Sequence, residues 1–276
     1  MMATEESKAT QKEALNLHVF MVATNKYLNY WKNTALSLNN AISPHINVSL
    51  SLFTDDPKTA RDFADTTLSK IALITHKIPN FGWPDATLMR YRWISAAIED
   101  VPQNAICMYL DSDMFVKSDF SEFLNPKVWK SGIALVQHPG YARRSGLRGM
   151  LDCNRPWVLV NQIKKMCFIP YGPWEVSRKS LAFVPNKKKK MYVHGAVWFG
   201  IKESYFRMVS ELANRVDRDL SNGVIATWHD ESHLNWFSSY YDVTVLDSRF
   251  SYFAPYRRWL PRNYFIETVA NLEKTR

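Results

Sequence analysis

Two carboxylates stand one residue apart in the segment Asp111-Ser112-Asp113, directly after the apolar run at 105–110. Neighbouring carboxylates at a strand end can share a hard divalent cation, directly or through water. Mg²⁺ or Mn²⁺ held there would bridge a diphosphate and offset the negative charge that grows as the diphosphate departs. Because a strand can also end in two solvated aspartates, the pattern by itself is only a hypothesis for a metal site.

A second group of ionisable residues is the octet WHDESHLN at 228–235. His229 and His233 are four residues apart, so on a helix they share a face and could ligate zinc. Zinc peptidases place Glu directly after the first His, whereas this sequence has Asp230 there, which weakens the hydrolase hypothesis. A capped helix whose histidines are satisfied by neighbours is the structural alternative. The density of ionisable groups beside a tryptophan favours a segment that lines a cleft.

Together with DSDM at 111–114 and HPG at 138–140, the octet resembles glycosyltransferase family 6, from about Val22 to Asp247. This family includes the histo-blood-group A and B transferases and the α1,3-galactosyltransferases. The resemblance implies the GT-A fold, an α/β fold with a Rossmann-like, mostly parallel central sheet and helices on both faces. It also implies a retaining transfer of galactose or N-acetylgalactosamine from a UDP-sugar, in α1,3 linkage, to a galactoside acceptor. Because no N-terminal membrane anchor is expected, the sequence resembles the soluble bacterial or viral members of the family.

The resemblance assigns roles by position. Glu231 matches the candidate nucleophile or stabiliser of the oxocarbenium-like centre, and Asp111 and Asp113 match the metal pair, with Mn²⁺ (or Mg²⁺) expected. Contacts to the nucleotide sugar are expected from Ala23, Thr24, Tyr27, Arg90, Asp111, Ser112, Asp113, His194, Gly195, Ala196 and Asp230. By the same resemblance, Arg90 would either orient an aspartate or touch the sugar. Contacts to the sugars and acceptor are expected from Trp83, His138, Trp228, Asp230 and Glu231.

Structural alternatives stay open for several of these residues. Tyr27 is either the ring that stacks on uracil or part of the first turn of a helix. His138 either touches the acceptor or caps a turn before Pro139. His194-Gly195-Ala196 matches the triplet that chooses the donor sugar, but small residues also suit a tightly packed strand. Pro173 stands where animal members have Thr, which leaves the acceptor open.

The hydrophobic pattern predicts the elements that position these residues. We expect strands at 17–23, 47–53, 71–74, 105–110, 133–137, 191–201 and 243–246, and helices at 28–38, 58–65, 87–98 and 203–216. The run at 191–201 is apolar enough to be buried throughout. Alternation of strands and helices in the first half predicts a mostly parallel sheet covered on both faces. Ligands gather at the carboxyl ends of such strands, where Asp111 stands.

Composition sets the outer limits. Of the 276 residues, 46% are hydrophobic and 22% are charged, which is typical of a packed globular protein. We expect a polar tail at 1–15 and a single catalytic domain at 16–276, with a nucleotide-binding half at about 16–115 and an acceptor-binding half at about 116–276. No apolar run is long enough for a membrane span, and the first residues lack a signal peptide. The 3 cysteines are too sparse for a disulfide scaffold, so a cytoplasmic protein is expected.

The 35 Lys and Arg outnumber the 26 Asp and Glu, for a net charge of +9. This charge favours anionic partners: nucleotide phosphates, nucleic acid or an acidic membrane face. None of the 9 glycines forms a phosphate-binding loop, so a metal and basic side chains must neutralise a diphosphate. Arg257, Arg258 and Arg262 are candidates for such a lid. The run Lys187–Lys190 is either a solvated loop or a contact with a membrane. A binding module for sugar or nucleic acid is the remaining alternative, and the resemblance favours a UDP-sugar and a glycan acceptor over nucleic acid.

Overall fold

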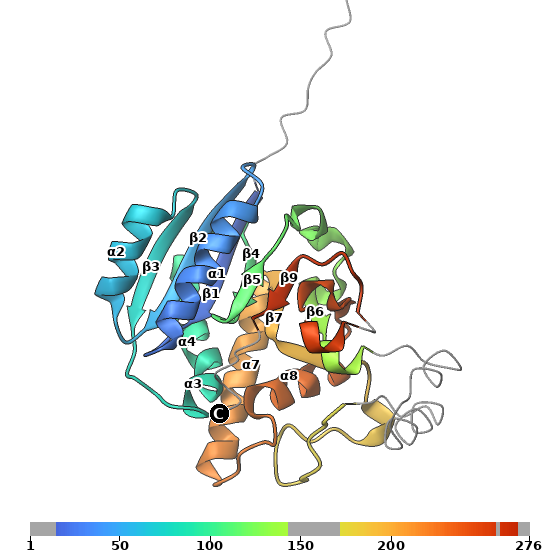
Figure 1. Cartoon of the computed structure of the whole chain (residues 1–276). Coiled ribbons are helices and arrows are strands. Elements are labelled where there is room, and N and C mark those ends of the chain that lie inside the picture. Colours follow the sequence, from blue (N-terminus) through green and yellow to red (C-terminus); the bar gives the residue numbers. More distant parts are fainter. Residues whose placement is uncertain (1–14, 143–171, 258–259, 270–276) are drawn as a thin grey trace, which may run out of the picture.

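The computed structural model describes residues 15–142, 172–257 and 260–269. Its main sheet has seven strands in the order β3-β2-β1-β4-β7-β6-β8. Their bounds are β1 (Leu15–Val22), β2 (Ile46–Thr54), β3 (Ile71–Lys77), β4 (Ile106–Leu110), β6 (Ile133–Gln137), β7 (Val193–Ile201) and β8 (Thr244–Leu246). Every pairing is parallel except those of β7, which runs antiparallel to both β4 and β6. The mostly parallel α/β sheet is thereby confirmed, and strands from both halves of the chain share it (Figure 1).

Helices cover both faces of this sheet. They are α1 (Tyr27–Ala41), α2 (Pro57–Thr67), α3 (Asp85–Leu88), α4 (Arg90–Ala96), α7 (Lys202–Ser221) and α8 (His229–Tyr240). In β1, Leu17, Val19 and Met21 pack in one core cluster with α1 and α2. Phe20 points to the opposite face, into the cluster formed by α4, α7 and α8. The strand period of two therefore divides one apolar segment between two cores.

Two expectations need correction, and one small sheet was not foreseen. The helix predicted at 87–98 is broken at Met89 into α3 and α4, immediately before Arg90, whose side chain turns inward and donates its Nε–H to the Thr87 carbonyl. The apolar run at 191–201 is not buried throughout, because Met191 is 49% exposed and β7 starts at Val193. A two-stranded sheet of β5 (Met114–Val116) and β9 (Ile266–Thr268) was not predicted.

Arg258, one of the candidate lid residues, and two of the 3 cysteines, Cys153 and Cys167, lie outside the described residues. Within the described ranges, none of the helices combines the length and the apolar character that crossing a membrane requires.

Candidate active site

A pocket of about 520 Å³ opens at the carboxyl ends of β1 and β4. In open α/β sheets, ligands bind at this edge, where neighbouring connections diverge to opposite faces. Seven predicted site residues line the pocket: Thr24, Tyr27, Trp83, Arg90, Asp111, Ser112 and Asp113. The other lining residues are Val22, Asn25, Lys26, Asn80, Phe81, Gly82, Ala86, Thr87 and Tyr109. The volume lies in the usual range for small-molecule sites.

The turn after β1 forms one wall of the pocket. Ala23 is buried and does not line the pocket, but its N–H donates to the Phe53 carbonyl at 2.9 Å and so fixes where the turn begins. Asn25 has a φ of 52° and donates its N–H to the Asp55 carboxylate at 3.0 Å. Tyr27 starts α1, lines the pocket and packs against the core, so both interpretations of this residue have a structural basis.

Asp111 is held in a defined orientation at the floor of the pocket. Its Oδ1 accepts from the Tyr109 hydroxyl at 2.7 Å and from Arg90 Nη1 at 3.2 Å. Its N–H donates to the carbonyl of Ala196, whose side chain is buried in the core. Asp113 lines the same pocket. Two carboxylates at the edge of a pocket suit Mg²⁺ or Mn²⁺, which in phosphate sites are held by one or two carboxylates together with phosphate oxygens.

Arg90 joins this pair to the octet. The guanidinium is buried and lies 4.7 Å from the centroid of the Tyr109 ring. Nη2 pairs with Asp230 Oδ2 at 2.9 Å, while Nη1 also donates to the Gly195 carbonyl at 3.1 Å. The rigid and permanently charged guanidinium of Arg90 therefore fixes the candidate metal pair, β7 and the start of α8 relative to one another.

The octet forms the first turns of α8, and its first helical residue, His229, has a φ of 48°. A positive φ is uncommon outside glycine and is often found at functional sites. Asp230 is buried beside Arg90, and its backbone carbonyl accepts from the Tyr91 hydroxyl at 3.0 Å. Burial raises the pKa of Asp230 to about 6, although the positive charge of Arg90 acts in the opposite direction.

Glu231 accepts the Gly195 N–H at Oε2, at 2.8 Å. Burial raises the pKa of Glu231 to about 8, and the hydrogen bond from Gly195 only partly offsets this. The close approach explains the glycine, because a Cβ at position 195 would lie 3.3 Å from Glu231 Cβ and 3.4 Å from Asp230 Oδ2. The close packing against Glu231 and Asp230 is thus a structural reason for a glycine at position 195 of the His-Gly-Ala triplet.

Asn235, the last residue of the octet, attaches α8 to β7. Its amide accepts the Val193 N–H at 2.8 Å and donates to the Val193 carbonyl at 2.8 Å and the Glu231 carbonyl at 2.9 Å. Neither this function of Asn235 nor the hydrogen bond from Tyr109 to Asp111 was predicted. Tyr109 had a signal, because it stands two residues before Asp111 and residues two apart on a strand share a face.

His138 and His194 lie beside Glu231. Their ring centroids are 4.6 Å apart, and burial lowers the pKa of His194 to about 4 and that of His138 well below its usual value. His138 caps the turn at Pro139, as one interpretation proposed, since its Nδ1 accepts the Gly140 N–H at 3.0 Å. His194 Nδ1 hydrogen-bonds the Ser251 hydroxyl. Both imidazoles are therefore neutral near pH 7 and suited to hydrogen-bonding sugar hydroxyls.

Within the described residues, His138, His194 and Glu231 are the one group of three side chains whose potential metal-ligating atoms all lie within 4.8 Å of one another. Since His138 Nδ1 accepts a backbone N–H, the proton of the neutral ring is on Nε2. A metal at Nε2 would move that proton to Nδ1, where it would face the Gly140 N–H. The cluster is therefore better suited to hydrogen bonding than to holding a resident metal.

The remaining predicted residues lie at the edges of the site. Trp83 is 76% exposed and packs its ring against that of His229, with centroids 4.6 Å apart, while Trp228 is 50% exposed. His233 is buried 3.5 Å from Asp219, on α7. Neither His229 nor His233 belongs to a three-ligand group in the described part of the chain, which gives the zinc-hydrolase alternative no support.

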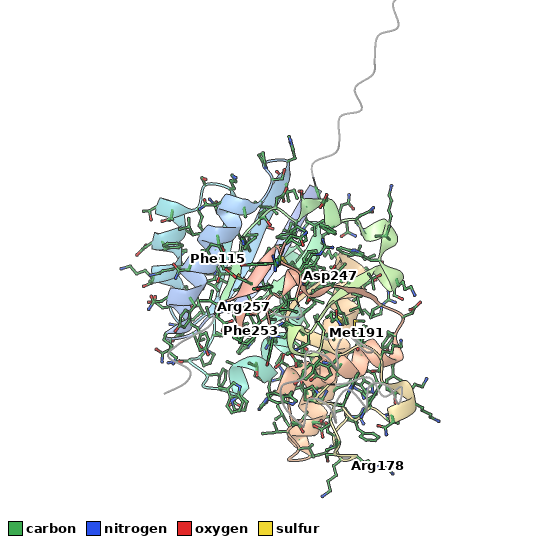
Figure 2. The ribbon with its side chains drawn as sticks, turned by 45° about the vertical axis from the view of Figure 1, so that its right-hand side comes forward. Phe115, Arg178, Met191, Asp247, Phe253 and Arg257 are labelled. Atoms are coloured by element: carbon green, nitrogen blue, oxygen red, sulfur yellow. The ribbon has the colours of Figure 1, made fainter. Side chains whose placement is uncertain are left out.

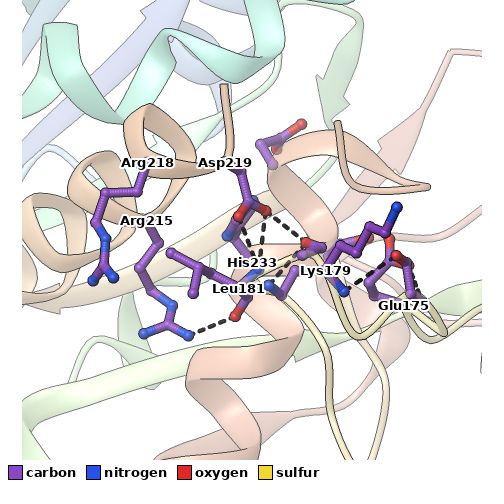
Figure 3. A network of polar contacts seen from close by, with 12 residues as sticks. Glu175, Lys179, Leu181, Arg215, Arg218, Asp219 and His233 are labelled. Atoms are coloured by element: carbon purple, nitrogen blue, oxygen red, sulfur yellow. Dashed lines mark hydrogen bonds and ion pairs between the residues drawn. The ribbon is translucent and has the colours of Figure 1, made fainter. Parts of the chain in front are cut away.

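A polar network holds the segment before α8 (Figure 3). Glu175 is buried and accepts the N–H groups of Thr227 and Ser177, each at 2.6 Å. Asp219 accepts the Ser180 hydroxyl at 2.6 Å and the Leu181 N–H at 2.9 Å. Because Thr227 directly precedes the octet, Glu175 anchors the chain that enters the site.

This mostly parallel sheet, with helices on both faces, is the arrangement expected of the GT-A fold. The sequence model of the family described as glycosyltransferase family 6 matches residues 164–252 of this chain. The chain is 22% identical to the O-antigen biosynthesis glycosyltransferase WbnI of Escherichia coli over 238 residues, which cover 86% of this chain and 87% of that protein. It is 23% identical to the histo-blood group ABO system transferase 1 of Rattus norvegicus over 235 residues, 85% of this chain and 59% of that one.

A third relative is alpha-1,3-galactosyltransferase 2 of Homo sapiens, 27% identical over 156 residues, which cover 56% of this chain and 38% of that protein. Together with the family match, these relatives support the assignment of the chain to glycosyltransferase family 6.

Proposed function

We propose that the protein transfers galactose or N-acetylgalactosamine from a UDP-sugar, with retention and in α1,3 linkage, to a galactoside acceptor. The observation that carries the proposal is the set of contacts from Arg90 to Asp111, Asp230 and Gly195, which joins the donor pocket to Glu231. The names of relatives support the linkage and the sugars, since one is an alpha-1,3-galactosyltransferase and another a globoside alpha-1,3-N-acetylgalactosaminyltransferase.

In this proposal, residues 16–276 form one catalytic domain. Its first half, at 16–115, binds the nucleotide of the donor, and its second half, at 116–276, contacts the sugars. The donor pocket is lined entirely by residues of the 16–115 half, with Thr24 and Tyr27 near the nucleoside and Asp111 and Asp113 near the diphosphate. A divalent cation bound to these carboxylates would neutralise the departing diphosphate. The 116–276 half supplies Glu231 and the neutral His138 and His194 for the sugars.

Retention requires that the acceptor arrive on the face that the nucleotide leaves. Either a carboxylate attacks the anomeric carbon first and is displaced, or the acceptor attacks beside the leaving group. In both routes an anionic side chain stabilises the positive anomeric centre, and we assign this function to Glu231. The Gly195 N–H fixes one carboxyl oxygen, so the other is the candidate reacting atom.

The proposal is tested by measuring hydrolysis of a panel of UDP-sugars with Mn²⁺ and with chelator. We expect hydrolysis of UDP-galactose or UDP-N-acetylgalactosamine, stimulated by Mn²⁺, and loss of the stimulation in Asp113→Asn. Asp62→Asn, on the exposed side of α2, is the matched control and should retain it. Hydrolysis that is indifferent to chelator would overturn the metal assignment, and absence of hydrolysis with every UDP-sugar would overturn the donor class.

A further inference from the structure

The run of four lysines forms one surface with the end of α8, which we call the lysine-turn surface. It consists of Lys187, Lys188, Lys190, Met191, Tyr240 and Tyr241. The lysines belong to a turn in which Lys188 Nζ lies 5.5 Å from the centroid of the Tyr240 ring. Lys190 Nζ donates to the Tyr241 carbonyl at 3.0 Å. Two segments about fifty residues apart in sequence are thus packed side by side.

Large apolar groups are exposed among these lysines. Met191 is 49% exposed, Tyr240 45% and Tyr241 41%. Figure 2 shows Met191 on the half of the molecule that carries α7 and α8, away from the N-terminal strands. Lys189 differs from its neighbours, because its Nζ lies 5.7 Å from the Trp174 ring and burial lowers its pKa.

The lysines of this surface have no acidic partner within the described part of the chain. Among the ion pairs of the described residues, none involves Lys187, Lys188, Lys189 or Lys190. The acidic residue next to Tyr241, Asp242, pairs instead with Lys130 at 3.2 Å. The surface therefore combines net positive charge with exposed Met and Tyr side chains.

We propose that the lysine-turn surface docks on an anionic lipid bilayer. Lysines near such a bilayer gain electrostatic attraction, and their flexible stems let apolar neighbours enter the interface while the ammonium groups stay in water. Tyrosine suits the boundary between headgroups and acyl chains.

Single-stranded nucleic acid fits this surface less well, because its bases need free aromatic faces. The Tyr240 ring already stacks on Trp236, with centroids 5.0 Å apart, and carries Lys188 above it. The Tyr241 ring stacks on Phe237, with centroids 4.2 Å apart. Docking on a bilayer requires only the exposed edges of these two tyrosine rings and the positive charge of the lysines.

Docking here would bring the active site close to the membrane. Lys190 is four residues before His194, which corresponds to about 13 Å along an extended chain. If the proposed transferase function holds, the surface favours an acceptor anchored in an anionic membrane. The docking itself does not depend on that function, because it is measured without donor or acceptor.

The test is co-sedimentation of the full chain with vesicles of phosphatidylglycerol and phosphatidylcholine, and with vesicles of phosphatidylcholine alone. We expect binding only to the anionic vesicles. The triple variant K187S/K188S/K190S should bind them at least about tenfold more weakly, since each lysine contributes about 1 kcal/mol at such a surface. The control K58S/K70S/K77S removes the same charge from α2, from the connection that follows it and from β3, an edge strand of the sheet, and should bind nearly as tightly as the unmodified chain.

Equal losses in the two triple variants would overturn the proposal, because net charge rather than this surface would then explain binding. Undiminished binding of K187S/K188S/K190S with an unchanged thermal unfolding midpoint would overturn it as well. Tighter binding to a single-stranded RNA oligonucleotide than to anionic vesicles, lost in the same variant, would assign the surface to nucleic acid instead.

Discussion

At the residue level, the position of Glu231 and its protonation state are in conflict. A nucleophile or a stabiliser of positive charge must be ionised, yet burial raises the pKa of Glu231 to about 8. In the described part of the chain, the positive charge that acts on Glu231 is that of Arg90. A cation bound at Asp111 and Asp113 would add to it, so loading of the metal is expected to favour the ionised form that the transfer requires.

This conflict predicts a pH dependence. Below about pH 8, kcat/KM for donor hydrolysis should rise about tenfold per pH unit as Glu231 loses its proton in the free enzyme. The limb of the kcat profile, which reports the loaded enzyme, should lie at lower pH. The measurement is a pair of pH–rate profiles at low and at saturating donor. A flat kcat/KM profile from pH 6 to 8, where Glu231 changes charge, would contradict the assignment.

The raised pKa of Glu231 also predicts how stability depends on pH. Stability should fall as the pH rises, whereas kcat/KM should increase. The folded chain holds the Glu231 proton more tightly than the unfolded chain, whose glutamate has a pKa of 4.5. The free energy of unfolding is therefore expected to fall as the pH rises from 4.5 to about 8. Glu231→Gln, which stays neutral, should show a smaller fall in chemical denaturation at several pH values.

Gly195→Ala tests the packing of β7 against the two acidic residues. The added Cβ would lie 3.3 Å from Glu231 Cβ, closer than is usual, so Glu231 must move by a few tenths of an ångström. A displacement of this kind is expected to lower transfer by about tenfold or more, because catalysis depends steeply on the position of reacting groups. The donor pocket does not include position 195, so the Kd for UDP should remain nearly unchanged. Normal transfer by this variant would show that the contact is unimportant.

At the level of elements, periodicity predicted the long segments and missed the short ones. The spacing of Leu28, Trp31, Ala35 and Leu38 predicted α1, and all four are buried. β5 and β9 have three residues each, too few to show a period, and they pair across about 150 residues of sequence. The break between α3 and α4 depends on where Arg90 finds its partners, which a local pattern does not contain.

The buried carboxylate of Asp219, in α7, holds the segment at 180–181 and lies 3.5 Å from His233 of α8. Asp219→Asn replaces an acceptor oxygen beside the Ser180 hydroxyl and the Leu181 N–H with a donor. It should lower the free energy of unfolding by about 1–3 kcal/mol, the usual cost of an unsatisfied buried group. Asp217→Asn, on the same helix, disrupts only the partly exposed ion pair with Arg92 and should cost less than about 1 kcal/mol. Similar losses in the two variants, measured by urea denaturation, would contradict this difference.

At the level of the whole molecule, the site forms where the two halves of the sheet meet. The pairs that build it lie far apart in sequence: Arg90 is 105 residues from Gly195, and Tyr91 is 139 from Asp230. The acidic pair and the octet were recognised because each is a short, dense pattern. The bridge that Arg90 makes between them was not predictable from spacing, because it exists only after the sheet has formed. Net charge indicated anionic partners but not which surface would meet them.

The most direct test of the central claim compares Glu231→Gln with Glu203→Gln, a change at an exposed position at the start of α7. Transfer and UDP binding are measured together, in the presence of Mn²⁺. Glu231→Gln should lower kcat by at least about 100-fold, as expected when a group that stabilises developing charge is removed. The Kd for UDP should be unchanged, and Glu203→Gln should behave like the unmodified chain. Near-normal turnover of Glu231→Gln would contradict the proposal that this carboxylate supports the reacting sugar.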